Sequence, residues 1–92
     1  MADIDPISFF LHEKPVRTLV LLADKEKAWY ARMLAKETDT TYAHMVKLLD
    51  TMAELGLVIF EKEGRIKLVR LTDTGEELAH EFEAVLRRLG KI

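Results

Sequence analysis

The hydrophobic pattern of this chain changes its period once between residues 40 and 72, and this change constrains the fold more than any other feature. Before the change, apolar residues recur at helical spacing, at Met45, Leu48, Leu49, Met52 and Leu55. Gly56 follows, and glycine commonly ends a helix because it adopts left-handed backbone without steric cost. Two β-rich runs come next, over residues 57–62 and 66–71, joined by a tight turn at Glu63-Gly64-Arg65. The pattern predicts a helix over about 40–55 that leads directly into a β-hairpin over about 57–71.

The segments on either side of this unit are expected to be helical, over residues 15–24, 27–38 and 73–89. Pro15 suits the first turn of a helix, because its missing N–H would have no partner there. Asp39 or Thr40 can accept the free N–H groups that open the helix over 40–55, and Thr72 or Asp73 can do so for the last helix. The pattern therefore predicts four helices and one hairpin.

The length of 92 residues predicts one domain, because a second hydrophobic core would not fit. Residues 1–14 form an N-terminal arm that holds either a short strand or a helical turn. Residues 15–72 form the core and the hairpin, and residues 73–90 form the C-terminal helix. The fold class is mainly α with a small β-hairpin, a winged helix-turn-helix with a three-helix core, a wing and a C-terminal helix.

Composition is that of a soluble globular protein, with 49% hydrophobic and 33% charged residues. No apolar run is long enough to cross a bilayer, no signal peptide is recognisable and cysteine is absent, so a cytoplasmic protein is expected. The formal net charge is −2, from 14 basic and 16 acidic residues, which is low for a nucleic-acid-binding protein. Residues 40–72 are the only net-positive third, with five basic residues (Lys47, Lys62, Arg65, Lys67, Arg70) against four acidic ones (Asp50, Glu54, Glu61, Glu63).

The polar side of the helix over 40–55 is suited to contact with DNA. At 100° per residue, the side opposite or flanking the apolar stripe holds Thr40, Ala43, His44, Lys47 and Thr51. Lys47 can reach a guanine edge or a phosphate, and His44 and Thr40 can bond to base edges or phosphate oxygens. The alternative is an ordinary solvated amphipathic helix.

Three basic residues gather at the tip of the expected hairpin, Lys62, Arg65 and Lys67. Long basic side chains on a two-stranded loop can straddle a phosphate backbone or enter the minor groove. The alternative is that the lysines protect an edge strand from pairing with another chain, and the neighbouring residues Glu61 and Glu63 keep that alternative open.

Several short motifs resemble those of MarR-like winged-helix transcription regulators. The run from Thr40 to Leu57 resembles their recognition helix and its Gly-Leu-Val step into the wing. Leu34-Ala35 matches the preceding helix, and the run from Leu71 to Gly75 matches Leu-Thr-x-x-Gly after the wing. Together the motifs cover roughly residues 30–80, and the chain is similar to small archaeal proteins of this group. The resemblance implies a DNA-binding, usually dimeric regulator in which Lys47 is a common basic position. This chain is shorter than a full MarR protein, whose extra terminal helices build the dimer and a ligand cleft, and its wing is less basic.

Apolar residues near both ends of the chain exceed what a bare winged helix can cover. They are Phe9, Phe10, Phe82, Val85, Leu86 and Leu89. Contiguous apolar surface of this kind marks an interface, so a twofold homodimer with a palindromic DNA site is expected. The alternative is that the last helix folds back on its own domain.

The sequence indicates neither an enzyme nor a cofactor. His12-Glu13 and His80-Glu81 lack a second histidine at helical spacing, so no metal site is expected. Ser8 is the only serine, and no glycine-rich phosphate loop is present. Trp29 and Tyr30 are expected to open the second helix and to complete the core or a subunit contact.

Two functions from different classes remain. The first is sequence-specific binding of double-stranded DNA by a homodimeric transcriptional regulator. The second is a winged-helix protein–protein interaction module without DNA binding, which the near-neutral charge favours.

Overall fold

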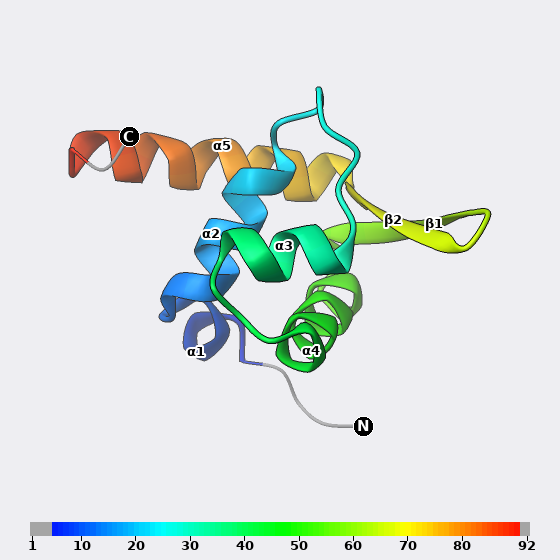
Figure 1. The fold of residues 1–92 in the computed structure, drawn as a ribbon. Helices are drawn as coiled ribbons and strands as arrows, with labels where there is room; N and C mark the ends of the chain where they lie inside the picture. The colour runs from blue at the N-terminus through cyan, green and yellow to red at the C-terminus, as the bar shows by residue number, and fades with distance from the viewer. Residues whose placement is uncertain (1–4, 91–92) are drawn as a thin grey trace.

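The computed structural model describes residues 5–90, and within them the chain forms five helices and one hairpin. The elements are α1 (Pro6–Phe10), α2 (Glu13–Leu22), α3 (Ala31–Glu37), α4 (Tyr42–Glu54), β1 (Val58–Glu63), β2 (Ile66–Leu71) and α5 (Asp73–Arg88). Helices α2, α3 and α4 form a compact group, the hairpin projects from one side of it, and α5 runs across α2 (Figure 1). This is the winged helix-turn-helix that the sequence predicts. No helix within residues 5–90 is long and apolar enough to span a membrane.

The hydrophobic core lies between α2, α3 and α4. The largest fully buried apolar side chains come from α2, α3 and α4: they are Leu19, Leu34, Met45, Leu49 and Met52. Leu48 is also buried and Leu55 is half-buried, so the apolar stripe of α4 faces inward as expected. Burial of each such side chain stabilises the fold by about 1.5–3 kcal/mol relative to exposure.

The segment before α3 differs from its prediction. Trp29 and Tyr30 do not open a helix, because their backbone is extended and pairs with β2. The Val69 N–H donates to the Trp29 carbonyl at 2.9 Å, and Tyr30 forms a bridge with Leu68. The indole of Trp29 is 3% exposed and donates to the Asp24 carbonyl at 3.0 Å. The edge of β2 thus gains a partner, and α3 begins at Ala31 rather than near Lys27.

The N-terminal segment is helical, which resolves the alternatives of strand and helical turn. The side chain of Asp5 caps α1 and accepts a hydrogen bond from the Ile7 N–H at 3.1 Å. Helix α2 then begins at Glu13, so Pro15 lies in its first turn as expected. The rest of the expected arm, residues 1–4, lies outside the described residues.

The start of α5 is tied to the point where α4 passes into the wing. The Thr72 N–H donates to the Leu57 carbonyl at 2.9 Å, and the Thr72 hydroxyl donates to the Gly56 carbonyl at 2.7 Å. The same hydroxyl accepts the Gly75 N–H at 3.0 Å and so caps α5. A Cβ atom at Gly75 would lie 2.0 Å from the Leu57 carbonyl oxygen, so only glycine fits there.

Candidate nucleic-acid interface

The first half of α4 is exposed and begins with a side-chain cap. The Thr41 hydroxyl accepts the His44 N–H at 3.1 Å. Ala43, His44 and Lys47 are all exposed. No hydrogen bond or ion pair found among residues 5–90 uses the side chain of His44 or Lys47. These three positions of the predicted DNA-contacting face are therefore open to a partner.

The cap of α4 is Thr41, so the prediction of Asp39 or Thr40 was wrong. Asp39 has a φ of 55°, which places it in left-handed backbone. Its N–H bonds to the Lys36 carbonyl at 3.2 Å, and the Thr40 N–H bonds to the Ala35 carbonyl at 2.8 Å. This pair of bonds is the Schellman pattern that closes a helix. Asp39 and Thr40 therefore end α3, and the next residue caps α4.

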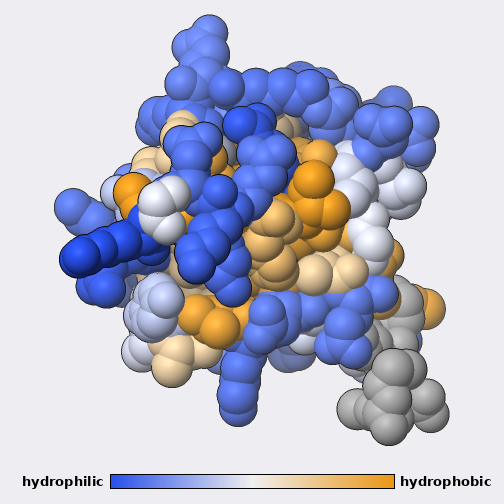
Figure 2. Space-filling model, turned by 90° about the vertical axis from the view of Figure 1, so that its right-hand side faces the viewer, coloured by the Kyte–Doolittle hydropathy of each residue, from blue (hydrophilic) through white to orange (hydrophobic). Residues whose placement is uncertain are grey.

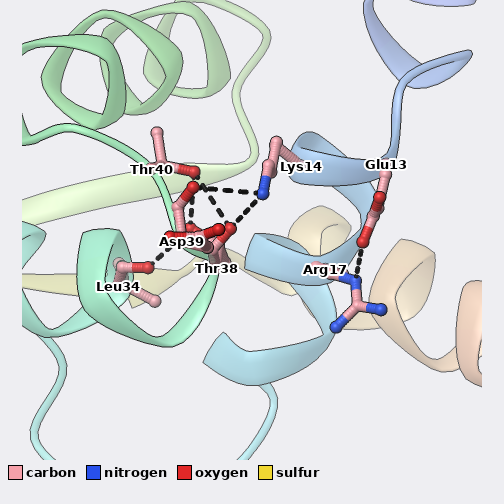
Figure 3. A network of polar contacts seen from close by, with 7 residues as sticks. All are labelled: Glu13, Lys14, Arg17, Leu34, Thr38, Asp39 and Thr40. Carbon is pink, nitrogen blue, oxygen red and sulfur yellow. Dashed lines mark hydrogen bonds and ion pairs between the residues drawn. The ribbon is translucent and has the colours of Figure 1, made fainter.

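A network of polar contacts from α2 and α3 holds this turn (Figure 3). The Lys14 ammonium group donates to the carbonyls of Thr38 and Asp39, the latter at 3.2 Å. The buried Thr38 hydroxyl donates to the Leu34 carbonyl at 2.7 Å and lies 2.9 Å from the Thr40 hydroxyl. The hydroxyl of Thr40 is thus engaged in the turn. Lys14 was not identified from the sequence, because it lies 24 residues before Thr38 and nothing local marks the contact.

Thr51, another predicted contact, bonds to its own helix. Its hydroxyl donates to the Lys47 carbonyl at 3.1 Å, and the residue is half-buried. Of the five predicted positions on this helix, Thr40 and Thr51 therefore make internal hydrogen bonds. Ala43, His44 and Lys47 lie on the open surface.

The two lysines of the wing lie on one face of the hairpin. The strands pair in a register that sets Lys62 directly opposite Lys67, and Phe60 opposite Val69 on the same face. The hairpin turns at Gly64-Arg65, where Gly64 has a φ of 64°. Lys62, Arg65 and Lys67 are all exposed.

The acidic residues of the wing occupy the other face. Glu61 and Glu63 alternate with Lys62, so their side chains point away from the lysine pair. Glu61 forms an ion pair with Arg70 at 2.6 Å on that face. Directly opposed like charges destabilise a hairpin, so the Lys62–Lys67 pair opposes hairpin stability. Such a pair suits a surface that meets an anionic partner.

A groove of about 360 Å³ separates α4 from the wing. Its charged lining residues are Arg32, Asp50, Arg65 and Lys67, and its other lining residues include Tyr30, Tyr42, Val46, Leu49, Phe60, Ile66 and Val69. Figure 2 looks onto the molecule from the wing side and shows apolar surface between hydrophilic side chains. Arg32 and Tyr42 were not identified from the sequence as part of this surface. They come from two helices and meet only because the turn between α3 and α4 folds them together, with the guanidinium 5.3 Å from the ring centre.

The aromatic residues predicted for a dimer interface contact one another within the chain. The ring centres of Phe10 and Phe82 lie 5.3 Å apart, and Phe9 meets Phe10 edge-on at 4.9 Å. All three are half-buried. The first part of α5 is thus packed on its own domain, through α1 and α2.

The end of α5 is more open. Val85 is 50% exposed and Leu89 is 66% exposed, while Leu86 is half-buried. Two residues of the N-terminal segment are more exposed still, Ile7 at 72% and Leu11 at 77%. The last turns of α5 project beyond the helical core (Figure 1).

Within residues 5–90 there is no group of three or more His, Cys, Asp or Glu side chains that could hold a metal ion. His80, at which no metal site was expected, lies 3.0 Å from the carboxylate of Glu83.

No protein-family model matches the chain. An uncharacterized protein of Archaeoglobus fulgidus is 26% identical over 57 residues, which are 62% of this chain and 60% of that protein. Among solved structures, AF1382 of Archaeoglobus fulgidus superimposes with a TM-score of 0.80 and 22% identity, over 92% of this chain and 97% of its own.

Two bacterial regulators have the same fold. MepR, a transcription regulator of the Staphylococcus aureus multidrug efflux pump MepA, has a TM-score of 0.78 and 21% identity, over 91% of this chain and 64% of its own. The MarR family transcriptional regulator SPO1453 of Silicibacter pomeroyi has a TM-score of 0.75 and 33% identity, over 91% of this chain and 61% of its own. A MepR variant has been solved bound to an oligodeoxyribonucleotide. The chain thus spans less than two thirds of each bacterial regulator, and these neighbours are transcription regulators rather than enzymes.

Proposed function

We propose that this chain, which has the winged-helix fold of the MarR-family transcription regulators, is itself a regulator that binds specific sites in double-stranded DNA as a homodimer. The observation that carries the proposal is the open first half of α4 beside a wing whose two lysines share one face. Both features belong to the only net-positive third of the chain.

The first half of α4 is suited to enter the major groove. Ala43 is small and lets the helix backbone approach the bases closely, while His44 and Lys47 can extend to base edges or phosphates. Thr41 keeps the first turn of α4 ordered, and Lys14 holds the turn before it. The helix therefore reaches DNA in a fixed position, which lowers the entropy lost on binding.

The wing is suited to the neighbouring minor groove or its backbone. Arg65 lies at the tip of the wing. Lys62 and Lys67 lie on either side of the turn, opposite each other on one face of the hairpin. A phosphate backbone between the two lysines would relieve their mutual repulsion. Phosphate contacts from the wing would position the protein, and α4 would read the sequence.

A homodimer is supported by the exposed apolar residues at the two ends of the described chain, Ile7, Leu11, Val85 and Leu89. The net charge of −2 gives a single copy little nonspecific attraction to DNA. Two joined copies would double the contacts with one palindromic site.

Fluorescence anisotropy with a pool of labelled genomic fragments, at two salt concentrations, tests the proposal. Lys47→Ala should weaken binding to a selected fragment, by about 1–3 kcal/mol if Lys47 contacts a base. The matched control is Lys25→Ala, because Lys25 pairs with Glu76 at the start of α5, outside the proposed surface. The control should bind as the unmodified protein does.

The alternative of a protein-interaction module makes the opposite prediction. A folded protein that binds no fragment even at low salt would exclude the proposal and favour that module. Binding that is equally strong after Lys47→Ala would exclude α4 as the reading element.

A further inference from the structure

We infer that the groove between α4 and the wing holds one sugar–phosphate strand of the DNA, gripped by Arg32 from α3 and Lys67 from β2. The inference rests on the proposed function and adds one contact residue, Arg32, and a route for the strand between Arg32 and Lys67. A helix in the major groove and a hairpin in the next minor groove have one backbone strand between them. In this molecule the space between those two elements is the groove.

The charge of the groove fits a phosphate strand. Its charged lining residues are three cations, Arg32, Arg65 and Lys67, and one carboxylate, Asp50, so its local charge is 3 − 1 = +2. The formal charge of the chain is −2. The ion pairs found among residues 5–90 involve none of these three cations. Their charges are therefore available to a partner.

Two of the cations are held in place by aromatic rings on opposite walls. The Arg32 guanidinium lies 5.3 Å from the centre of the Tyr42 ring, and the Lys67 ammonium lies 4.9 Å from the centre of the Phe60 ring. A ring stabilises a cation without using its N–H donors as an ion pair does. Both groups can thus donate to phosphate oxygens from preset positions.

The rest of the lining suits the sugar part of the strand. Val46 and Phe60 supply apolar surface against which a deoxyribose can pack. Tyr42 is 53% exposed, and its hydroxyl can donate to a phosphate oxygen. Asp50 is the one group that opposes the strand, and it offers a variant that should strengthen binding.

The test measures anisotropy of a labelled duplex of mixed sequence over a range of salt concentrations, with the full chain and its variants. Arg32→Gln and Lys67→Gln should each weaken binding roughly 5- to 10-fold at 0.1 M salt. Each should also lower the slope of log K against log salt by about 0.9 per subunit. The loss should be the same for different duplex sequences, since phosphates carry no sequence information. Asp50→Asn should strengthen binding.

The control for the groove variants is Arg17→Gln. Arg17 pairs with Glu13 on α2 and points away from the turn in Figure 3. It should leave both affinity and slope unchanged. Arg32→Lys should recover most of the slope lost in Arg32→Gln, because it restores the charge.

The result separates the groove inference from the proposed function. If the unmodified chain binds no duplex, the proposed function fails and the groove inference fails with it. If the chain binds and Lys47→Ala weakens binding, while Arg32→Gln and Lys67→Gln keep the original slope, the groove inference is overturned and the proposed function stands. Unfolding of either groove variant is checked by circular dichroism, and Asp50→Asn then provides the independent measurement.

Discussion

Gly75 shows how one residue determines where an element lies. It occupies the first turn of α5, where a glycine ordinarily weakens a helix by about 1 kcal/mol relative to alanine. Here the helix passes so close to the Leu57 carbonyl that no Cβ atom fits. The close approach also brings Thr72 within bonding distance of Gly56 and Leu57. The Gly-Leu-Val and Leu-Thr-x-x-Gly motifs, read separately in the sequence, are thus two sides of one contact.

Gly75→Ala should lower the free energy of unfolding by at least about 2 kcal/mol, because the backbone of α5 or of Leu57 must shift to admit the methyl group. Urea denaturation followed by circular dichroism measures the change. Thr74→Ala, at the neighbouring exposed position, is the control and should stay within about 0.5 kcal/mol of the unmodified protein. Equal stability of Gly75→Ala and the unmodified chain would contradict the packing described for this junction.

Among the elements, the wing is the one in which a residue pair that favours binding of an anionic partner lowers the stability of the hairpin. Its lysine pair suits an anionic partner, whereas hairpin stability favours opposite charges at these positions. The wing therefore offers a test in which stability and binding move in opposite directions.

Lys62→Glu should raise the free energy of unfolding by about 0.2–1 kcal/mol, because the exposed pair becomes attractive. The same change should weaken DNA binding, since a phosphate contact is replaced by repulsion. Denaturation and anisotropy measure the two effects. In the control Lys62→Glu/Lys67→Glu, like charges oppose each other again, so the gain in stability should vanish while DNA binding stays weak. A rise in both stability and affinity for Lys62→Glu would argue against contact between the wing and DNA.

The elements also show which parts of the fold were predictable from the sequence. Helix α4 and the hairpin depend on local periodicity and on Gly56, so their existence and their inward faces were predicted. The start of α3 was not, because Trp29 and Tyr30 are extended by pairing with β2, some 40 residues later in the chain. In the candidate interface, too, positions set by local periodicity were predictable and positions set by contacts between elements were not. The exposure of Lys47 follows from helical spacing. Arg32 instead meets Tyr42 only through the turn between α3 and α4, and the period of neither helix predicts that contact.

At the scale of the whole molecule, the exposed apolar residues Ile7, Leu11, Val85 and Leu89 lead us to expect that two copies of the chain associate. Val85 and Leu89 are the test positions because they lie on the surface, whereas Phe82 packs against Phe10 within the chain. Val85→Glu/Leu89→Glu should convert a micromolar dimer into monomers, because charges would be buried in an apolar contact. The monomers should have lower DNA affinity.

Light scattering measures this change, with Ile59→Glu as the control. Ile59 on the wing is as exposed as Val85, at 50% each, so its replacement removes similar apolar surface from another place. Ile59→Glu should remain dimeric. A monomeric unmodified protein at high concentration would remove the dimer and the palindromic site from the proposed function.

The hydrogen bond from the Thr72 N–H to the Leu57 carbonyl affects how the length of the wing can change. It joins the two ends of the wing at its base, where Val58 also pairs with Leu71. Residues inserted at the Gly64-Arg65 turn would thus lengthen a loop that is already closed, and doubling such a loop costs only about 0.6 kcal/mol. The helices would keep their positions, because α5 is anchored at the base rather than through the tip. A longer or differently charged wing would therefore need no redesign of the core, and under the proposed function it would alter the reach along DNA.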